Sequence, residues 1–335
     1  MNLILGLLII AVGAFCQSSS YVPINKIKEW SWESYWLVQG VFAWLVFPLL
    51  GALLAVPAGE SLFGMFASNG KASLLTILFG ALWGVGGLTF GLSMRYLGVA
   101  LGQSIALGTC AGLGAILGPV FTGHAHDLTS SVIIGVVVTL AGIAIIGVAG
   151  AMKSAAMPEE EKKKAVKDFN FGKGIAVALL AGFISACFNI GLSFGEPLSW
   201  EGTPDIFRSL PATLLVTFGG FLTNACYCLY QNRRNKSWGD YKRKDLWGNN
   251  VVFCILAGLL WYSQFFGLSL GKGFLAAYPA LITFSWCILM SLNVVFSNVW
   301  GIILKEWKGV SRKTVAVLVA GIVVLIISTF LPQII

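Results

Sequence analysis

Apolar residues run without a charged side chain through ten long stretches of this chain. The stretches are residues 1–25, 34–59, 72–94, 96–126, 128–152, 174–195, 209–232, 246–271, 273–304 and 314–335. A helix rises about 1.5 Å per residue, so about 20 apolar residues cross the hydrocarbon core of a bilayer. Each stretch can cross once, and runs such as "VIIGVVVTLAGIAIIGVAG" lack the polar–apolar alternation of a barrel strand. The pattern predicts an all-α membrane protein with ten transmembrane helices.

Composition and charge placement add an orientation to this prediction. Only 11% of the 335 residues are charged, whereas a soluble domain carries about a quarter. Of the 22 Lys and Arg residues, 19 fall in the loops that follow the odd-numbered stretches. Basic loops stay on the cytoplasmic side of a membrane. We therefore expect these loops to be cytoplasmic and both termini to lie on the outer (periplasmic) side.

The two halves of the chain resemble each other at three places separated by 172 to 179 residues. The matching segments are "LAGIAII" (140–146) with "VAGIVVL" (319–325), "GALW" (80–83) with "GLLW" (258–261), and "AFCQ" ending in Gln17 with "ACFN" ending in Asn189. Five helices are an odd number, so two copies of a five-helix unit lie in opposite orientations. The sequence predicts two inverted five-helix repeats, 1–152 and 173–335, joined by a charged cytoplasmic linker at 153–172. This architecture is typical of alternating-access carriers.

Glycines crowd the stretch "GALWGVGGLTFGLSMRYLG" (80–98). It is not a dinucleotide-binding loop, because Thr89 stands where the third glycine belongs and the segment lies inside a predicted span. The glycines instead fall four residues apart, as in Gly80/Gly84 and Gly267/Gly271. Small residues at that spacing share one helix face and let neighbouring backbones approach closely. We expect tightly packed helices.

Polar and aromatic side chains within the spans are the candidate substrate-binding residues, since buried polar groups are costly without a partner. They are Gln17, Trp83, Asn189, Trp261, Tyr262 and Gln264. Amides and aromatic rings together suit a neutral sugar, which offers hydroxyl groups and C–H faces. The alternative is that these groups only hydrogen-bond between helices.

Four segments resemble the bacterial L-rhamnose–proton symporter family of the drug/metabolite transporter superfamily. They are "KIKEWSWESYW" (26–36), "FGALWGVGGLTFGLSMRYLG" (79–98), "WYSQFF" (261–266) and "LKEWKG" (304–309). The resemblance covers most of the chain in the same order. It implies a multi-pass carrier of the bacterial inner (cytoplasmic) membrane that imports L-rhamnose, or a related 6-deoxyhexose, with protons.

A proton symporter needs a group that binds and releases a proton, yet no Asp or Glu lies in the middle of a predicted span. Glu196, at the outer end of the sixth span, is the ion-coupling candidate, because desolvation would raise its pKa. Its alternative is a solvated acid at a helix mouth. Arg95 is either a topology anchor or an inner gate that pairs with Glu33 or Glu306.

Other functions remain open at this stage. The same fold could carry another small neutral solute, with Na⁺ in place of H⁺ as the coupling ion. A membrane-embedded transferase would need a cluster of acids, histidines or a metal, and "HAHD" (124–127) is better explained as a solvated loop. We therefore expect no enzyme activity, no cofactor and no metal. The expected partners are a neutral sugar and the lipid bilayer, and not nucleic acid. We expect the basic segments to be ordinary cytoplasmic loops. The alternative is that they bind lipid headgroups or nucleic acid.

Overall fold

The computed structural model describes residues 2–97, 99–156, 171–305 and 307–334 of the chain. These ranges contain helices joined by loops and turns, and no strand. Within them, nine helices are long and apolar enough to cross a membrane. Each overlaps one of the first nine predicted stretches, so the all-α membrane architecture is confirmed. The tenth stretch overlaps a shorter apolar helix of 17 residues, α14 (Arg312–Ser328).

The chain forms two compact units, and each combines segments from both halves of the sequence. The first unit is Met1–Gly84 with Gly191–Ala276, and the second is Val85–Ile190 with Ala277–Ile335. Two long helices, α6 (Gly70–Leu97) and α10 (Phe171–Phe194), pass from one unit into the other. The predicted linker at 153–172 lies largely outside the described residues.

The first unit holds most of the predicted site residues. Its remaining helices are α1 (Asn2–Ser19), α2 (Tyr21–Ile24), α3 (Trp32–Val41), η1 (Phe42–Val46), α4 (Phe47–Leu53), α5 (Leu62–Ser68), α11 (Leu210–Asn235), η3 (Ser237–Lys242) and α12 (Lys244–Phe274). Side-chain caps start some of them: Ser61 Oγ, for example, accepts a hydrogen bond from Gly64 N at the start of α5.

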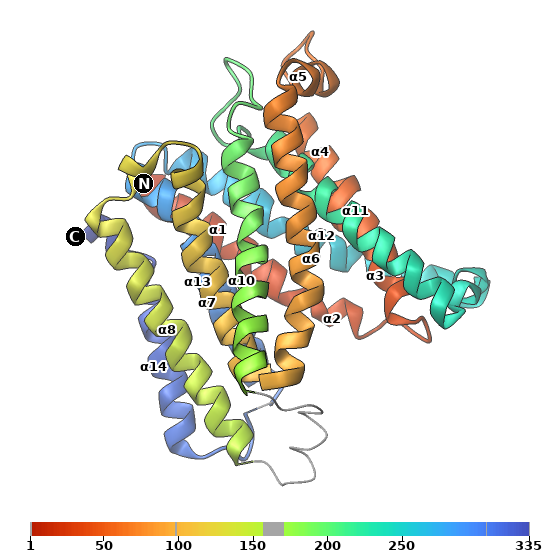
Figure 1. Cartoon of the computed structure of the whole chain (residues 1–335), viewed down its shortest axis with the longest axis vertical. Helices are drawn as coiled ribbons and strands as arrows, with labels where there is room; N and C mark the ends of the chain where they lie inside the picture. Colours follow the sequence, from red (N-terminus) through yellow and green to blue (C-terminus); the bar gives the residue numbers. More distant parts are fainter. Residues whose placement is uncertain (1, 98, 157–170, 306, 335) are drawn as a thin grey trace. The chain divides into compact units, whose positions relative to one another are not determined.

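Glycines let α1 and α12 pack backbone to backbone in this unit (Figure 1). A Cβ atom at Gly13 would lie 2.8 Å from Ser263 O, and one at Gly267 would lie 3.0 Å from Ile9 O. At Gly271 it would overlap with the side chain of Ile10. The close approach predicted for Gly267 and Gly271 is thereby confirmed.

The second unit contains the C-terminal part of α6, most of α10 and a further set of helices. They are α7 (Val99–Phe121), η2 (Ala125–Asp127), α8 (Ser130–Ala155), α13 (Pro279–Ile303), α14 and α15 (Leu331–Ile334). Buried aromatic side chains join its helices, as where the rings of Phe188 and Trp286 stack at 5.8 Å. Trp286 Nε1 also donates to Cys110 O at 3.2 Å.

Helices α8 and α14 lie side by side in antiparallel directions in this unit (Figure 1). Gly142 faces Leu325, and Gly321 faces Ile146. One turn beyond Gly142, toward the start of α8, Thr139 Oγ1 donates to Ser328 Oγ at 3.1 Å. Residue numbers thus fall on α8 as they rise on α14. The two glycines leave no room for side chains, so the helices interlock closely.

Candidate functional site

Three tryptophans from three helices meet in the first unit, and we call Trp44, Trp83 and Trp261 the tryptophan triad. Trp44 lies on η1, with its ring centroid 6.1 Å from that of Trp83 on α6 and 5.7 Å from that of Trp261 on α12. The rings of Trp83 and Trp261 are also 5.7 Å apart. The structure therefore brings the two predicted tryptophans, Trp83 and Trp261, together. Trp44 completes the triad and was not predicted.

A proline explains the unusual backbone that carries Trp44. Pro48 has no N–H to bond with the carbonyl of Trp44 four residues earlier, and its ring would crowd that carbonyl. The chain widens into a π-helical turn over η1, in which Phe47 N bonds to Phe42 O. Such turns are rare and occur often at functional sites. The proline four residues after a tryptophan is the one feature of the sequence that could have pointed to Trp44.

Helix α12 runs along α3, η1 and α4 and meets them at small residues. Cys254 Sγ donates to Tyr35 O at 3.6 Å, and a Cβ at Gly258 would lie 3.0 Å from Ala43 N. Further along, a Cβ at Gly51 would overlap with the hydroxyl of Tyr262. Tyr262 and the triad therefore belong to the same helix interface.

Three buried polar atoms along this interface have no hydrogen-bond partner among the described residues. They are Gln39 Oε1, Trp44 Nε1 and Tyr262 Oη. A buried polar atom without a partner costs about 1–3 kcal/mol. One acceptor, one donor and one hydroxyl that can do both would match the hydroxyl groups of a sugar. Gln39, like Trp44, was missed in the sequence because its burial depends on α12.

Close contacts between α6 and α11, which we call the seam, fix the position of Trp83. A Cβ at Gly80 would overlap with Val216 O, and Thr223 Oγ1 donates to Ala81 O at 2.9 Å. Asn224 Nδ2 donates to Gly84 O at 3.3 Å. These contacts confirm the close packing expected around Gly80.

The same asparagine ties the seam to α3. Asn224 Oδ1 accepts a hydrogen bond of 3.1 Å from Trp36 Nε1. The ring of Trp36 in turn lies 5.6 Å from the ring of Trp44. Asn224 therefore acts between helices, and its amide group is occupied.

The remaining predicted binding residues are divided between the units. Gln17 is half-buried on α1, and Gln264 is buried on the adjoining α12, where Nε2 donates to Trp261 O at 3.2 Å. Asn189 belongs to the second unit, where Nδ2 donates to Gly114 O at 2.7 Å. This bond ties α10 to α7, so part of Asn189 serves the packing between helices.

The charged candidates have different surroundings. Glu33 is only 4% exposed at the start of α3, and its Oε1 accepts from Ser237 Oγ at 2.6 Å and from Asn235 Nδ2 at 3.0 Å. Glu196 follows α10 and is exposed. Glu306 and the side chain of Arg95 lie outside the described residues, so the gate stays a prediction.

Asp240 on η3 holds the loop before α3 in place. Its Oδ2 accepts hydrogen bonds from Ser31 N at 2.8 Å and from Ser34 Oγ at 2.7 Å. Burial acts to raise the pKa of Asp240, but the hydrogen bonds from Ser31 and Ser34 and the nearby Arg243 outweigh it and hold the pKa below its usual value. This contact could not be predicted from a short sequence motif, because it joins residues about 200 positions apart.

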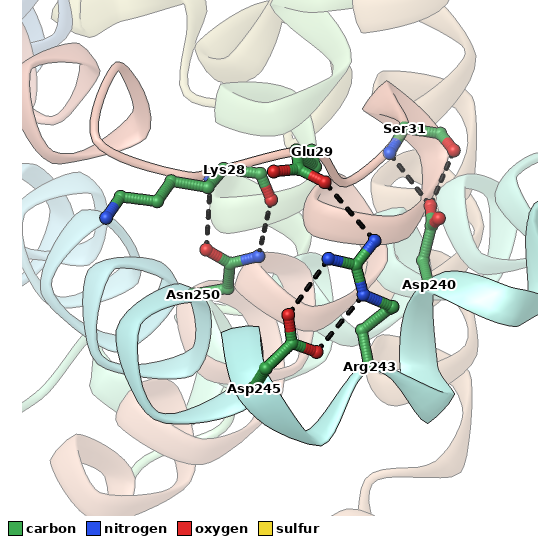
Figure 2. Close-up of polar contacts among 7 residues, drawn as sticks. All are labelled: Lys28, Glu29, Ser31, Asp240, Arg243, Asp245 and Asn250. Carbon is green, nitrogen blue, oxygen red and sulfur yellow. Dashed lines mark hydrogen bonds and ion pairs between the residues drawn. The ribbon is translucent and has the colours of Figure 1, made fainter.

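Further polar contacts join the same two segments (Figure 2). Asn250 accepts from Lys28 N at 3.0 Å and donates to Lys28 O at 2.8 Å. Arg243 pairs with Asp245 at 2.9 Å and with Glu29 at 3.2 Å. The loop before α3 and the segment around η3 therefore form one ordered structure at this end of the unit.

Residues 1–333 match the family described as L-rhamnose-proton symport protein (RhaT). The L-rhamnose-proton symporter of Yersinia pestis (strain Pestoides F) is 33% identical over 341 aligned positions, which cover 97% of this chain and 96% of that protein. The protein of the same name from Yersinia pseudotuberculosis serotype O:1b (strain IP 31758) shows the same identity and coverage. The similarity extends through both units.

Proposed function

The chain belongs to the L-rhamnose-proton symport protein family, and we propose from this premise that it imports L-rhamnose, or a related 6-deoxyhexose, together with protons. The observation that carries the proposal is the similarity to symporters of that name along nearly the whole chain. The protein is thus a secondary transporter of the bacterial inner membrane and not an enzyme. The nine long apolar helices of the described ranges agree with a multi-pass location.

The tryptophan triad with Gln39 and Tyr262 is the proposed centre of sugar recognition. Flat indole faces can cover the C–H faces of a sugar ring, while the three polar atoms that have no partner in the described part of the chain can bond to its hydroxyl groups. Most of the candidate residues are uncharged, which favours a neutral substrate over a nucleotide sugar or an organic cation.

Two further amides of the first unit are proposed to contribute at the edges of the site. Gln17 and Gln264 lie on the tightly packed pair α1 and α12, which also carries Trp261. Asn189 stays a candidate substrate-binding residue within the second unit, where its amide nitrogen bonds to Gly114 and leaves its side-chain oxygen for a substrate. The amide-for-amide match of Gln17 and Asn189 follows from the proposed repeat.

We propose ten spans arranged as inverted repeats of residues 1–152 and 173–335, with both termini outside. Gly142 faces Leu325 while Gly321 faces Ile146, and an offset of 179 positions exchanges the two contacts. A reciprocal contact between antiparallel helices is what a two-fold axis perpendicular to both would produce. Such an axis lies in the membrane plane and relates inverted repeats. The 17 residues of α14 are within the range that crosses a bilayer.

The residues proposed for proton coupling and for an inner gate are charged residues near the helix ends. Glu196 remains the candidate for taking up a proton, and Arg95 with Glu33 or Glu306 the candidate for an inner gate. Glu196→Gln should abolish the proton movement that accompanies sugar uptake, whereas unchanged coupling would discard this role. Arg95→Gln should impair transport and leave membrane insertion intact, and full activity would remove the gate.

Transport in de-energised cells tests substrate and ion together. Cells that express the protein are placed in weakly buffered anaerobic medium with a pH electrode, and L-rhamnose, L-fucose, L-lyxose and D-glucose are added in turn. Alkalinisation with L-rhamnose is expected. Sodium-dependent accumulation of labelled L-rhamnose without a pH change would assign Na⁺ as the coupling ion. Absence of L-rhamnose uptake would overturn the proposal.

Trp44→Phe tests the proposed site within the same assay. The change keeps an aromatic ring but removes the indole N–H, so we expect a higher KM for L-rhamnose at an unchanged amount of protein in the membrane. Trp200→Phe is the matched control, because Trp200 is a buried tryptophan of the same unit whose Nε1 already bonds to Glu60. Equal KM values in the two variants would remove Trp44 from the site.

A further inference from the structure

The exposed side chains of α11 change from aliphatic to aromatic to basic toward the C-terminal end of the helix. Leu222, near its middle, is 43% exposed, and Tyr230, about two turns later, is 60% exposed. The exposed side chains of Arg233 and Arg234 follow in the last turn. Aliphatic, aromatic and basic side chains in this order match the hydrocarbon core, the interface and the headgroup layer of a bilayer. The end of α11 therefore lies at the level of lipid headgroups.

Helix α12 shows the same order from its first residue inward. The exposed Lys244 opens the helix, and Trp247 is 47% exposed in its first turn. Val252 and Leu256, further along, are 52% and 42% exposed. Both α11 and α12 are long and apolar enough to cross a membrane, and η3 connects these two ends. Two spanning helices thus present basic and aromatic side chains at one level.

The basic side chains at this level carry uncompensated charge. We define the basic rim as the exposed residues Arg233, Arg234, Lys236, Lys242 and Lys244. None of them forms an ion pair with another residue in the described part of the chain. The acidic residues of the same segment are already engaged, Asp240 by two serines and Asp245 by Arg243.

Local contacts hold the rim on an ordered backbone. Trp247 Nε1 donates to Tyr241 O at 2.8 Å, and the rings of Trp238 and Tyr241 are 6.0 Å apart. The contacts of Asp240 and Arg243 with the loop before α3 fix the same segment (Figure 2). A surface that is ordered before binding loses less conformational entropy when a ligand arrives.

We propose that the basic rim, with Tyr230, Trp238 and Trp247 around it, binds the phosphate headgroup of an anionic phospholipid. Lysine and arginine attract anionic headgroups near the membrane surface, and interfacial aromatic rings pack at the junction of headgroup and acyl chain. The order of aliphatic, aromatic and basic side chains along α11 and α12 favours a lipid headgroup over nucleic acid as the bound group. The inference does not depend on the transported substrate.

Lipid retention on the purified full-length protein tests this binding site. The protein is incubated in detergent with equal amounts of phosphatidylglycerol and phosphatidylcholine, and the bound lipids are counted by native mass spectrometry. The test variant carries Arg233→Gln, Arg234→Gln and Lys236→Gln. The control carries Lys308→Gln, Arg312→Gln and Lys313→Gln, which remove the same charge from exposed positions elsewhere. Thermal unfolding of all three proteins checks their folding.

The wild-type and control proteins are expected to retain phosphatidylglycerol in preference to phosphatidylcholine, and the test variant to bind it at least about tenfold more weakly. Equal binding by the test and control variants would overturn the proposal, as would a wild-type protein that does not distinguish the two lipids. Displacement of the lipid by inorganic phosphate at equal concentration would assign the rim to a soluble anion. L-rhamnose uptake is measured separately, so failure here leaves the transport proposal standing.

Discussion

Gly80→Ala tests whether the seam between α6 and α11 positions the tryptophan triad. The added methyl group would overlap with Val216 O and would lie 2.8 Å from the carbonyl carbon, and neither backbone atom can rotate away. Carbon atoms pack at about 3.5–4.0 Å, so the helices must separate by about 1 Å. A shift of that size breaks the 2.9 Å hydrogen bond from Thr223 to Ala81, one residue from the substitution.

The expected magnitude follows from these two effects. Overpacking a filled interface costs about 1–3 kcal/mol, and a hydrogen bond between membrane helices contributes about 0.6 kcal/mol. We therefore expect the free energy of unfolding to fall by about 2–4 kcal/mol. Trp83 lies one turn from Gly80 and shifts with the seam, so KM for L-rhamnose should rise by about tenfold, which corresponds to about 1.4 kcal/mol of binding.

Denaturant unfolding in detergent and uptake kinetics in cells measure the two effects. Gly87→Ala is the matched control, because a Cβ at Gly87 on the same helix would meet no atom within 4 Å. The reasoning fails if Gly80→Ala and Gly87→Ala unfold at the same denaturant concentration. A loss of stability with an unchanged KM would keep the seam but separate it from the triad.

Three further substitutions test individual features. Tyr262→Phe removes a buried hydroxyl that has no partner among the described residues, so the sugar-free protein should gain about 1 kcal/mol of stability and bind L-rhamnose more weakly. A less stable variant in thermal unfolding would contradict this. Pro48→Ala restores the missing N–H and allows an ordinary helix through η1. The KM for L-rhamnose should then rise while the amount of protein in the membrane stays the same. An unchanged KM would count against a role of the π-helical turn. The lowered pKa of Asp240 means that its carboxylate stabilises the fold at neutral pH, and that this stability is lost as pH falls through the lowered pKa. Asp240→Asn should therefore melt at a lower temperature at neutral pH and lose less stability on acidification. Equal dependence of the melting temperature on pH in wild type and variant would refute this.

The predicted site residues are marked by a pattern in the sequence, whereas the missed ones are defined by contacts between segments that lie far apart in the chain. Trp83 and Trp261 could be predicted because they sit at matching positions of the two halves, and Gly80 because its spacing to Gly84 is local. Gln39 looks like an ordinary polar residue in the sequence, and the folded structure buries its side-chain oxygen where α3 meets α12. The contact between Asp240 and Ser31 spans 209 positions and follows no short motif.

The apolar stretches, the helical class and the family could all be predicted from the order of amino acids alone. These depend on local composition, because the thickness of the hydrocarbon core sets a length that each helix must satisfy alone. Which buried polar groups already have a hydrogen-bond partner, and which can bond to a substrate, depends on how the helices pack. Asn224 and Trp44 are both buried polar residues of spans, yet Asn224 bonds to Trp36 and Gly84 whereas Trp44 Nε1 has no partner among the described residues. That difference depends on contacts between helices far apart in the chain, which local composition does not encode.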